Sequence, residues 1–160
     1  MLPMKYHIWT EGCQMNVADS QRLASTLEHL GYEPGERAED ADLIILNTCV
    51  VRQSAEDKAY GRLSSLKPLK KQNPHLIIGL MGCLVGNRDP APLRKRFPWV
   101  DVFMPPSEPG PLLDFLAEQG RVDEGRALQA AEAARRLCID EDLLLPLEER
   151  SQLVAAQVPV

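Results

Sequence analysis

The sequence has no apolar run that approaches the roughly 20 residues needed to cross a bilayer. Its first residues also lack the charged and apolar regions of a signal peptide. These absences argue against membrane insertion and secretion, so we expect a cytoplasmic protein with no membrane partner. The formal net charge of -5 gives no overall attraction to nucleic acid, so any RNA affinity of this chain should be weak.

Motifs that bind phosphate through glycine-rich loops are also missing, because neither G-x-G-x-x-G nor G-x-x-x-x-G-K occurs. Their absence weakens one alternative, a non-enzymatic nucleotide- or flavin-binding module. No C-x-x-C pair occurs, which argues against a zinc ribbon or a thioredoxin-like dithiol. The chain has only four cysteines, and without signs of secretion we expect reduced thiols rather than disulfides.

What the chain does contain is a repeating order of apolar run, small-residue turn and amphipathic stretch. A short extra strand is expected to begin at Tyr32, and Asn16 and Ser54 are suited to cap the first two helices. The alternation predicts an α/β fold with a doubly wound, mostly parallel sheet, flavodoxin-like or Rossmann-like. Its main strands are expected at residues 5–10, 43–46, 76–81 and 100–104, with a last helix at residues 111–119.

The alternation ends near residue 119, and the composition then changes. We therefore predict one domain over residues 1–119 and a helical or irregular linker over residues 120–160, with helix favoured at residues 124–137. Cys138 lies in this linker, and an inert role is favoured for it over metal binding. If exposed, several apolar residues would form a patch through which the chain could form a homodimer: Leu143, Leu144, Leu145, Leu147, Leu153 and Val154.

The other three cysteines each follow a predicted strand: Cys13, Cys49 and Cys83. Because parallel strands share one carboxyl edge, we expect their turns to meet there. Each cysteine alone could be a small buried hydrophobe, but their equivalent positions in the repeat favour a shared site. Two of them follow a glycine, which permits close approach. The bare pattern does not choose between an iron-sulfur cluster and a three-cysteine zinc site with another ligand.

Three polar residues flank the cysteines. Asn16 and Asn47 could hydrogen-bond to sulfur atoms of the site or to substrate, although capping and turn roles compete with this. Arg52 could contact RNA phosphate, or it could form an ion pair with Glu56. Two basic clusters are interpreted as solvated helix faces rather than RNA contacts: Lys67, Lys70 and Lys71, and Arg94, Lys95 and Arg96.

Three motifs surround the cysteines: G-C-Q-M-N at residues 12–16, followed by Asp19-Ser20; A-D-L-I-I-L-N-T-C-V-V-R at 41–52, with A-E-D-K at 55–58; and I-I-G-L-M-G-C-L at 77–84. In these motifs the chain resembles the amino-terminal domain of the radical SAM methylthiotransferases. The similarity extends to about residue 118. The Q-M-N after Cys13 and the V-R after Cys49 are more similar to the branch that modifies tRNA than to the branch that acts on a ribosomal protein.

The resemblance implies that Cys13, Cys49 and Cys83 are the three thiolate ligands of an auxiliary 4Fe-4S cluster, which carries the sulfur to be transferred. It also implies a second 4Fe-4S cluster, held by C-x-x-x-C-x-x-C, which cleaves S-adenosylmethionine to produce a radical. The reaction would insert a methylthio group into an isopentenylated adenosine beside the anticodon of tRNA.

The chain departs from the full family pattern, because it contains no C-x-x-x-C-x-x-C. We therefore expect it to be part of a longer transferase that also has a radical SAM domain and a carboxy-terminal RNA-binding domain. Alone, the chain is expected not to turn over. Two alternatives stay open, namely the branch that acts on a ribosomal protein and a non-enzymatic zinc- or nucleotide-binding α/β module.

Overall fold

The computed structural model describes residues 2–49, 53–86 and 89–144. Its five-stranded sheet has the order β2-β1-β3-β4-β5, and every neighbouring pair of strands is parallel. This order is the flavodoxin-like one and confirms the predicted doubly wound α/β fold. The strands are β1 (Lys5–Glu11), β2 (Glu33–Pro34), β3 (Leu43–Thr48), β4 (Ile77–Gly82) and β5 (Val102–Met104).

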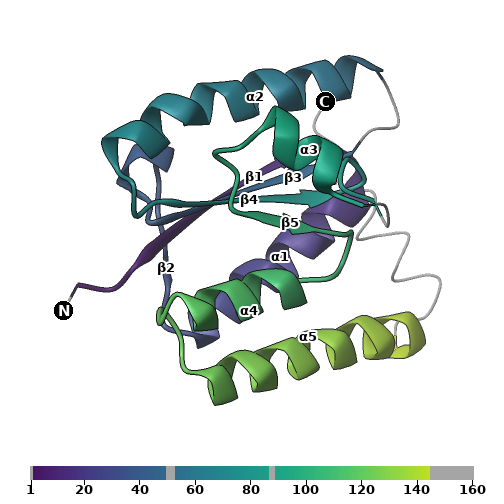
Figure 1. Ribbon diagram of the computed structural model, residues 1–160. Helices are drawn as coiled ribbons and strands as arrows, with labels where there is room; N and C mark the ends of the chain where they lie inside the picture. The colour runs from purple at the N-terminus through teal and green to yellow at the C-terminus, as the bar shows by residue number, and fades with distance from the viewer. Residues whose placement is uncertain (1, 50–52, 87–88, 145–160) are drawn as a thin grey trace.

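Helices cover both faces of the sheet. Helices α2 and α3 lie on one face, α1 and α4 lie on the other, and α5 packs outside α1 and α4 (Figure 1). The arrangement is that of a doubly wound sheet, in which right-handed crossovers that run in opposite directions along the sheet place their helices on opposite faces. The helices are α1 (Gln14–His29), α2 (Gln53–Gln72), α3 (Ala91–Arg96), α4 (Gly110–Glu118) and α5 (Glu124–Leu144), with a short 3-10 helix at Ala38–Asp40.

The central strand β3 joins the two halves of the core. All six of its residues are buried, as a continuous apolar run in a parallel sheet predicts. Side chains alternate along a strand, so Ile44 and Leu46 pack in the cluster that includes α2 residues. Leu43 and Ile45 pack in the cluster that includes residues of α1 and α4. The apolar part of β3 therefore lies between two apolar layers.

Local details differ from the sequence predictions at three helices. Helix α1 begins at Gln14 with Cys13 as its N-cap, so the prediction of Asn16 as the cap is wrong. Helix α2 begins at Gln53 and includes Ser54, so that predicted cap is also wrong. The sequence does not predict helix α3. This helix is short and buries no residue, so its sequence has no periodic apolar pattern.

The predicted helix at residues 124–137 is present as the first part of α5. Ala127 and Ala134 are buried, and α5 contacts both α4 and α1. Cys138 belongs to α5, but its side chain lies outside the described part of the chain. Most of the predicted dimerisation patch, from Leu145 onward, also lies outside the described residues. Among the residues that are described, none of the helices combines the length and hydropathy that crossing a bilayer requires.

Candidate functional site

The three cysteine-bearing turns lie side by side at the carboxyl edge of the sheet. The final residues of β1, β3 and β4 pair in one row across these strands, and each cysteine follows its strand within two residues. The N–H of Cys49 donates to the carbonyl of Glu11 at 2.9 Å. The N–H of Cys83 donates to the carbonyl of Thr48 at 3.0 Å. The turns therefore meet at one edge, as the predicted topology requires.

Two of these turns flank the point where the sheet changes winding direction. The chain passes from β1 through α1 to the outer strand β2, whereas it passes from β3 through α2 to β4 on the other side. The two helices lie on opposite faces of the sheet (Figure 1). Cys13 and Cys49 follow the two strands at this switch point, and open α/β sheets bind their ligands outside the carboxyl ends of such strands.

Glycine precedes two of the cysteines because the edge is crowded. A Cβ on Gly12 would lie 2.6 Å from the Cβ of Cys49. A Cβ on Gly82 would lie 2.2 Å from the carbonyl oxygen of Thr48, and Gly82 has φ +107°, which side chains disfavour. Because glycine has no side chain, the turns after β1 and β4 can lie close to the end of β3.

The cysteines differ in exposure. Cys49 is buried, whereas Cys13 and Cys83 are exposed. Within residues 2–49, 53–86 and 89–144, no group of three or more His, Cys, Asp or Glu side chains could hold a metal ion. The structure thus brings the three turns together without gathering three sulfurs into a ligand set. The donor chemistry and the crowded glycine turns nevertheless fit a group held by three thiolates, the ligand type of iron-sulfur clusters.

Two buried asparagines tie the cysteine turns together. The Oδ1 atom of Asn16 accepts hydrogen bonds from the Cys13 N–H at 3.2 Å and from the Cys13 thiol at 3.3 Å. The Nδ2 atom of Asn16 donates to Asn47 Oδ1 at 2.9 Å and to the Thr48 carbonyl at 3.1 Å. Asn47 in turn donates to the Asn16 carbonyl at 2.8 Å. Both predicted residues therefore lie at the site, and Asn16 reaches one of its sulfur atoms.

The third flanking residue, Arg52, lies outside the described residues. Its predicted partner Glu56 accepts a short hydrogen bond from the Tyr60 hydroxyl. Burial, with a smaller contribution from Glu56, raises the pKa of Tyr60. The basic clusters make specific contacts: Lys70 pairs with Asp101, and the Arg96 guanidinium lies 4.0 Å from the Tyr60 ring centroid.

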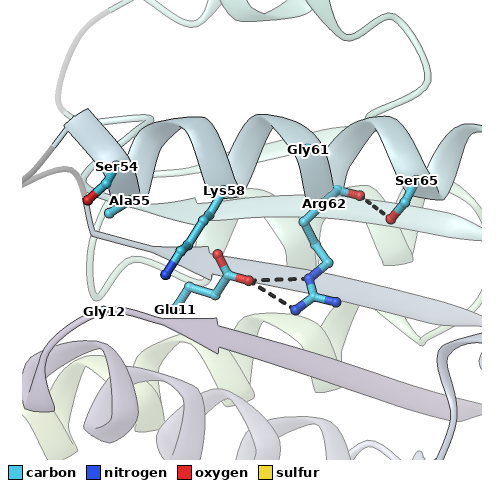
Figure 2. A pocket seen from close by; sticks show the side chains of 8 residues that line it. All are labelled: Glu11, Gly12, Ser54, Ala55, Lys58, Gly61, Arg62 and Ser65. Atoms are coloured by element: carbon cyan, nitrogen blue, oxygen red, sulfur yellow. Dashed lines mark hydrogen bonds and ion pairs between the residues drawn. The ribbon is translucent and has the colours of Figure 1, made fainter.

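Sequence reasoning missed a pocket of about 720 Å³ beside the cysteine edge, between the end of β1 and one face of α2. Figure 2 shows the ion pair that crosses it from β1 to α2. The spacing along α2 indicates a common helix face, but only the strand order shows that β1 lies opposite. The lining residues are Glu11, Gly12, Ser54, Ala55, Lys58, Gly61, Arg62 and Ser65.

The chain is similar to known proteins over the region that carries the three cysteine turns. The profile of the uncharacterized protein family UPF0004 matches residues 5–105. The tRNA-2-methylthio-N(6)-dimethylallyladenosine synthase of Herpetosiphon aurantiacus is 48% identical over 103 residues, which are 64% of this chain and 24% of that protein.

Two other relatives have the same name. The protein from Dictyoglomus thermophilum is 52% identical over 97 residues, 61% of this chain and 22% of the relative. The protein from Mycobacterium avium is 43% identical over 132 residues, 82% of this chain and 18% of the relative. The chain thus spans about a quarter or less of the length of these curated relatives. Their names agree with the predicted similarity to the tRNA-modifying branch.

Proposed function

Because the chain belongs to the uncharacterized protein family UPF0004, we propose that it is the cluster-binding amino-terminal domain of a tRNA methylthiotransferase. The observation that carries this proposal is the row of three cysteine turns at the carboxyl edge of β1, β3 and β4. The family match over residues 5–105 includes all three turns. The relatives' name specifies the product, a 2-methylthio group on dimethylallyladenosine in tRNA, which we propose for this protein as well.

In this proposal Cys13, Cys49 and Cys83 hold an auxiliary 4Fe-4S cluster, which supplies the position for the sulfur that is transferred. Three cysteine ligands leave one iron without a protein thiolate, which suits a reactive rather than a purely structural group. Asn16 would orient the Cys13 sulfur, because its side chain already contacts that atom. Asn47 would hold Asn16 in place through their mutual hydrogen bonds.

The remaining parts of the proposal concern the longer enzyme. It would contain a second 4Fe-4S cluster, bind S-adenosylmethionine, act on tRNA in the cytoplasm and include radical SAM and RNA-binding domains. Residues 1–119 would form the methylthiotransferase domain, and residues 120–160 would be the linker toward the radical SAM domain. In the described part of this segment, α5 packs against α1 and α4. The isolated chain would not turn over, and its association into a homodimer would depend on the apolar residues from Leu143 onward.

Anaerobic reconstitution with iron and sulfide tests the cluster. We expect about four irons per chain with matching sulfide and a visible absorption band, as for a 4Fe-4S group. Cys13→Ala, Cys49→Ala and Cys83→Ala should each lose most of this iron, whereas Cys138→Ala should retain it. Circular dichroism would verify that each variant is folded. Stoichiometric zinc in place of iron, or equal iron content in all four variants, would contradict the proposed cluster and favour a zinc or interaction module.

A further inference from the structure

The pocket between β1 and α2 adjoins the cysteine edge, because Gly12, which precedes Cys13, forms part of its lining. Ser54, Lys58, Gly61 and Ser65 line its other side at spacings of three to four residues, which places them on one face of α2. Gly61 leaves this face open, since a Cβ there would meet no atom within 4 Å. A ligand in this pocket would therefore lie next to the proposed cluster.

The two cationic side chains of the pocket, Arg62 and Lys58, differ in their hydrogen bonds and ion pairs. The Nε and Nη2 atoms of Arg62 each lie 3.2 Å from Glu11 Oε1. The guanidinium of Arg62 also lies 4.6 Å from the ring centroid of Trp9, which fixes its position further. Lys58 is exposed and extends from α2 toward the side of the pocket that Glu11 occupies (Figure 2). In the described part of the chain, no hydrogen bond or ion pair engages its ammonium group. Lys58 is therefore available to an anion.

Glu11, by contrast, has a carboxylate oxygen that needs a hydrogen-bond donor. Arg62 engages only its Oε1 atom, whereas Oε2 is buried and has no hydrogen-bond partner among the described residues. A buried carboxylate oxygen without a donor is unfavourable, because it has lost water and gained nothing in return. A ligand hydroxyl would satisfy Oε2, whereas a bare phosphate ion would be repelled by it. The pocket is thus suited to a ligand that has both a hydroxyl donor and an anionic group.

We propose that this pocket binds a ribose-phosphate unit, with Glu11 accepting a hydrogen bond from the 2′-hydroxyl and Lys58 binding the phosphate. The same chemistry occurs in a free ribonucleotide and in an RNA strand, and the choice of an RNA strand rests on the proposed function. Contact with the 2′-hydroxyl is how a protein distinguishes RNA from DNA at a given position. The pocket would therefore guide the RNA strand past the cysteine edge.

The test is fluorescence polarisation of the 160-residue chain with a labelled 12-nucleotide single-stranded RNA and with its 2′-deoxy counterpart. The unmodified chain should bind the RNA several-fold more tightly than the DNA. Lys58→Ala should weaken the binding of both strands about fivefold and reduce the salt slope by about 0.7, the value for one phosphate of a single strand. Glu11→Gln should remove the preference, because RNA affinity falls to the level of DNA.

Lys71→Ala is the matched control, because it removes the same charge from the exposed far end of the same helix. It should change affinity by less than about twofold, as a distant screened charge does. Equal affinity of the unmodified chain for RNA and DNA would overturn the proposal. So would losses of the same size in Lys58→Ala and Lys71→Ala, since they would indicate diffuse attraction.

Adenosine 5′-monophosphate distinguishes the two ligand sources. If it binds as tightly as the RNA strand and loses affinity in Glu11→Gln, a free nucleotide is the ligand and the RNA assignment is wrong. Iron content measured on the same preparations separates the two proposals. If the unmodified chain binds four irons but does not prefer RNA, the pocket proposal alone is overturned. If the unmodified chain prefers RNA but binds no iron after reconstitution, the pocket proposal is supported and the cluster proposal is contradicted.

Discussion

At the scale of single residues, Gly82 controls how the turn that carries Cys83 approaches β3. Replacing Gly82 by Ala would drive a Cβ to 2.2 Å from the Thr48 carbonyl oxygen at a φ of +107°. We expect Gly82→Ala to lower the free energy of unfolding by about 3 kcal/mol, because the obstacle is backbone that cannot rotate away. Urea unfolding followed by circular dichroism would measure the change.

Gly61→Ala provides the control for this prediction. Gly61 lies inside α2, where a Cβ would meet no atom within 4 Å. The substitution should raise stability by roughly 0.5–1 kcal/mol, because alanine has the higher helix propensity. If Gly82→Ala were as stable as Gly61→Ala, the close packing at the cysteine edge would not be as described.

The sequence predicts the residues of the site better than their contacts. A cysteine after each strand can be recognised from the apolar run before it, and parallel strands place all three turns on one edge. The pairing of Asn16 with Asn47 joins residues 31 positions apart, and the pair Glu11–Arg62 joins residues 51 positions apart. Such pairs depend on strand order and on the rotation of α2, and neither is encoded in local periodicity.

At the scale of elements, the packing of helix α5 determines whether the domain ends before or after this helix. It lies within residues 120–160, which are predicted to be a linker, yet it packs against α4 and α1. Ala134 is buried in this contact, whereas the adjacent Ala133 is exposed. We expect Ala134→Glu to lower the free energy of unfolding by about 2 kcal/mol, because it places a charge in an apolar contact.

Ala133→Glu should change stability by less than about 0.5 kcal/mol, as exposed substitutions usually do. Urea unfolding of the two variants, with hydrogen exchange of α5 amides, would compare them directly. Equal stability in both would mean that α5 is docked too weakly to belong to the domain. The helix itself follows from its Ala-rich composition, but its docking depends on the surface that α1 and α4 present together.

At the scale of the whole molecule, the fold separates charges that the sequence mixes. Helices α2 and α3 contain eight Lys and Arg residues and two Asp and Glu residues. Helices α1 and α4, together with residues 124–136 of α5, contain four Lys and Arg residues and six Asp and Glu residues. These two groups lie on opposite sides of the sheet (Figure 1). The net charge of -5 therefore does not reveal that the helices on one side of the sheet are basic and those on the other side are acidic.

This separation predicts that the chain binds heparin at low salt although its net charge is negative. The Debye length is about 10 Å at 0.1 M salt, so a polyanion on the α2 and α3 side is shielded from the acidic helices. Lys95→Glu should weaken heparin binding several-fold and lower the salt concentration of elution. Arg136→Glu changes the net charge equally on the exposed surface of α5 and should leave elution unchanged. Equal shifts in the two variants would show that net charge, rather than its division between the faces, governs binding to polyanions.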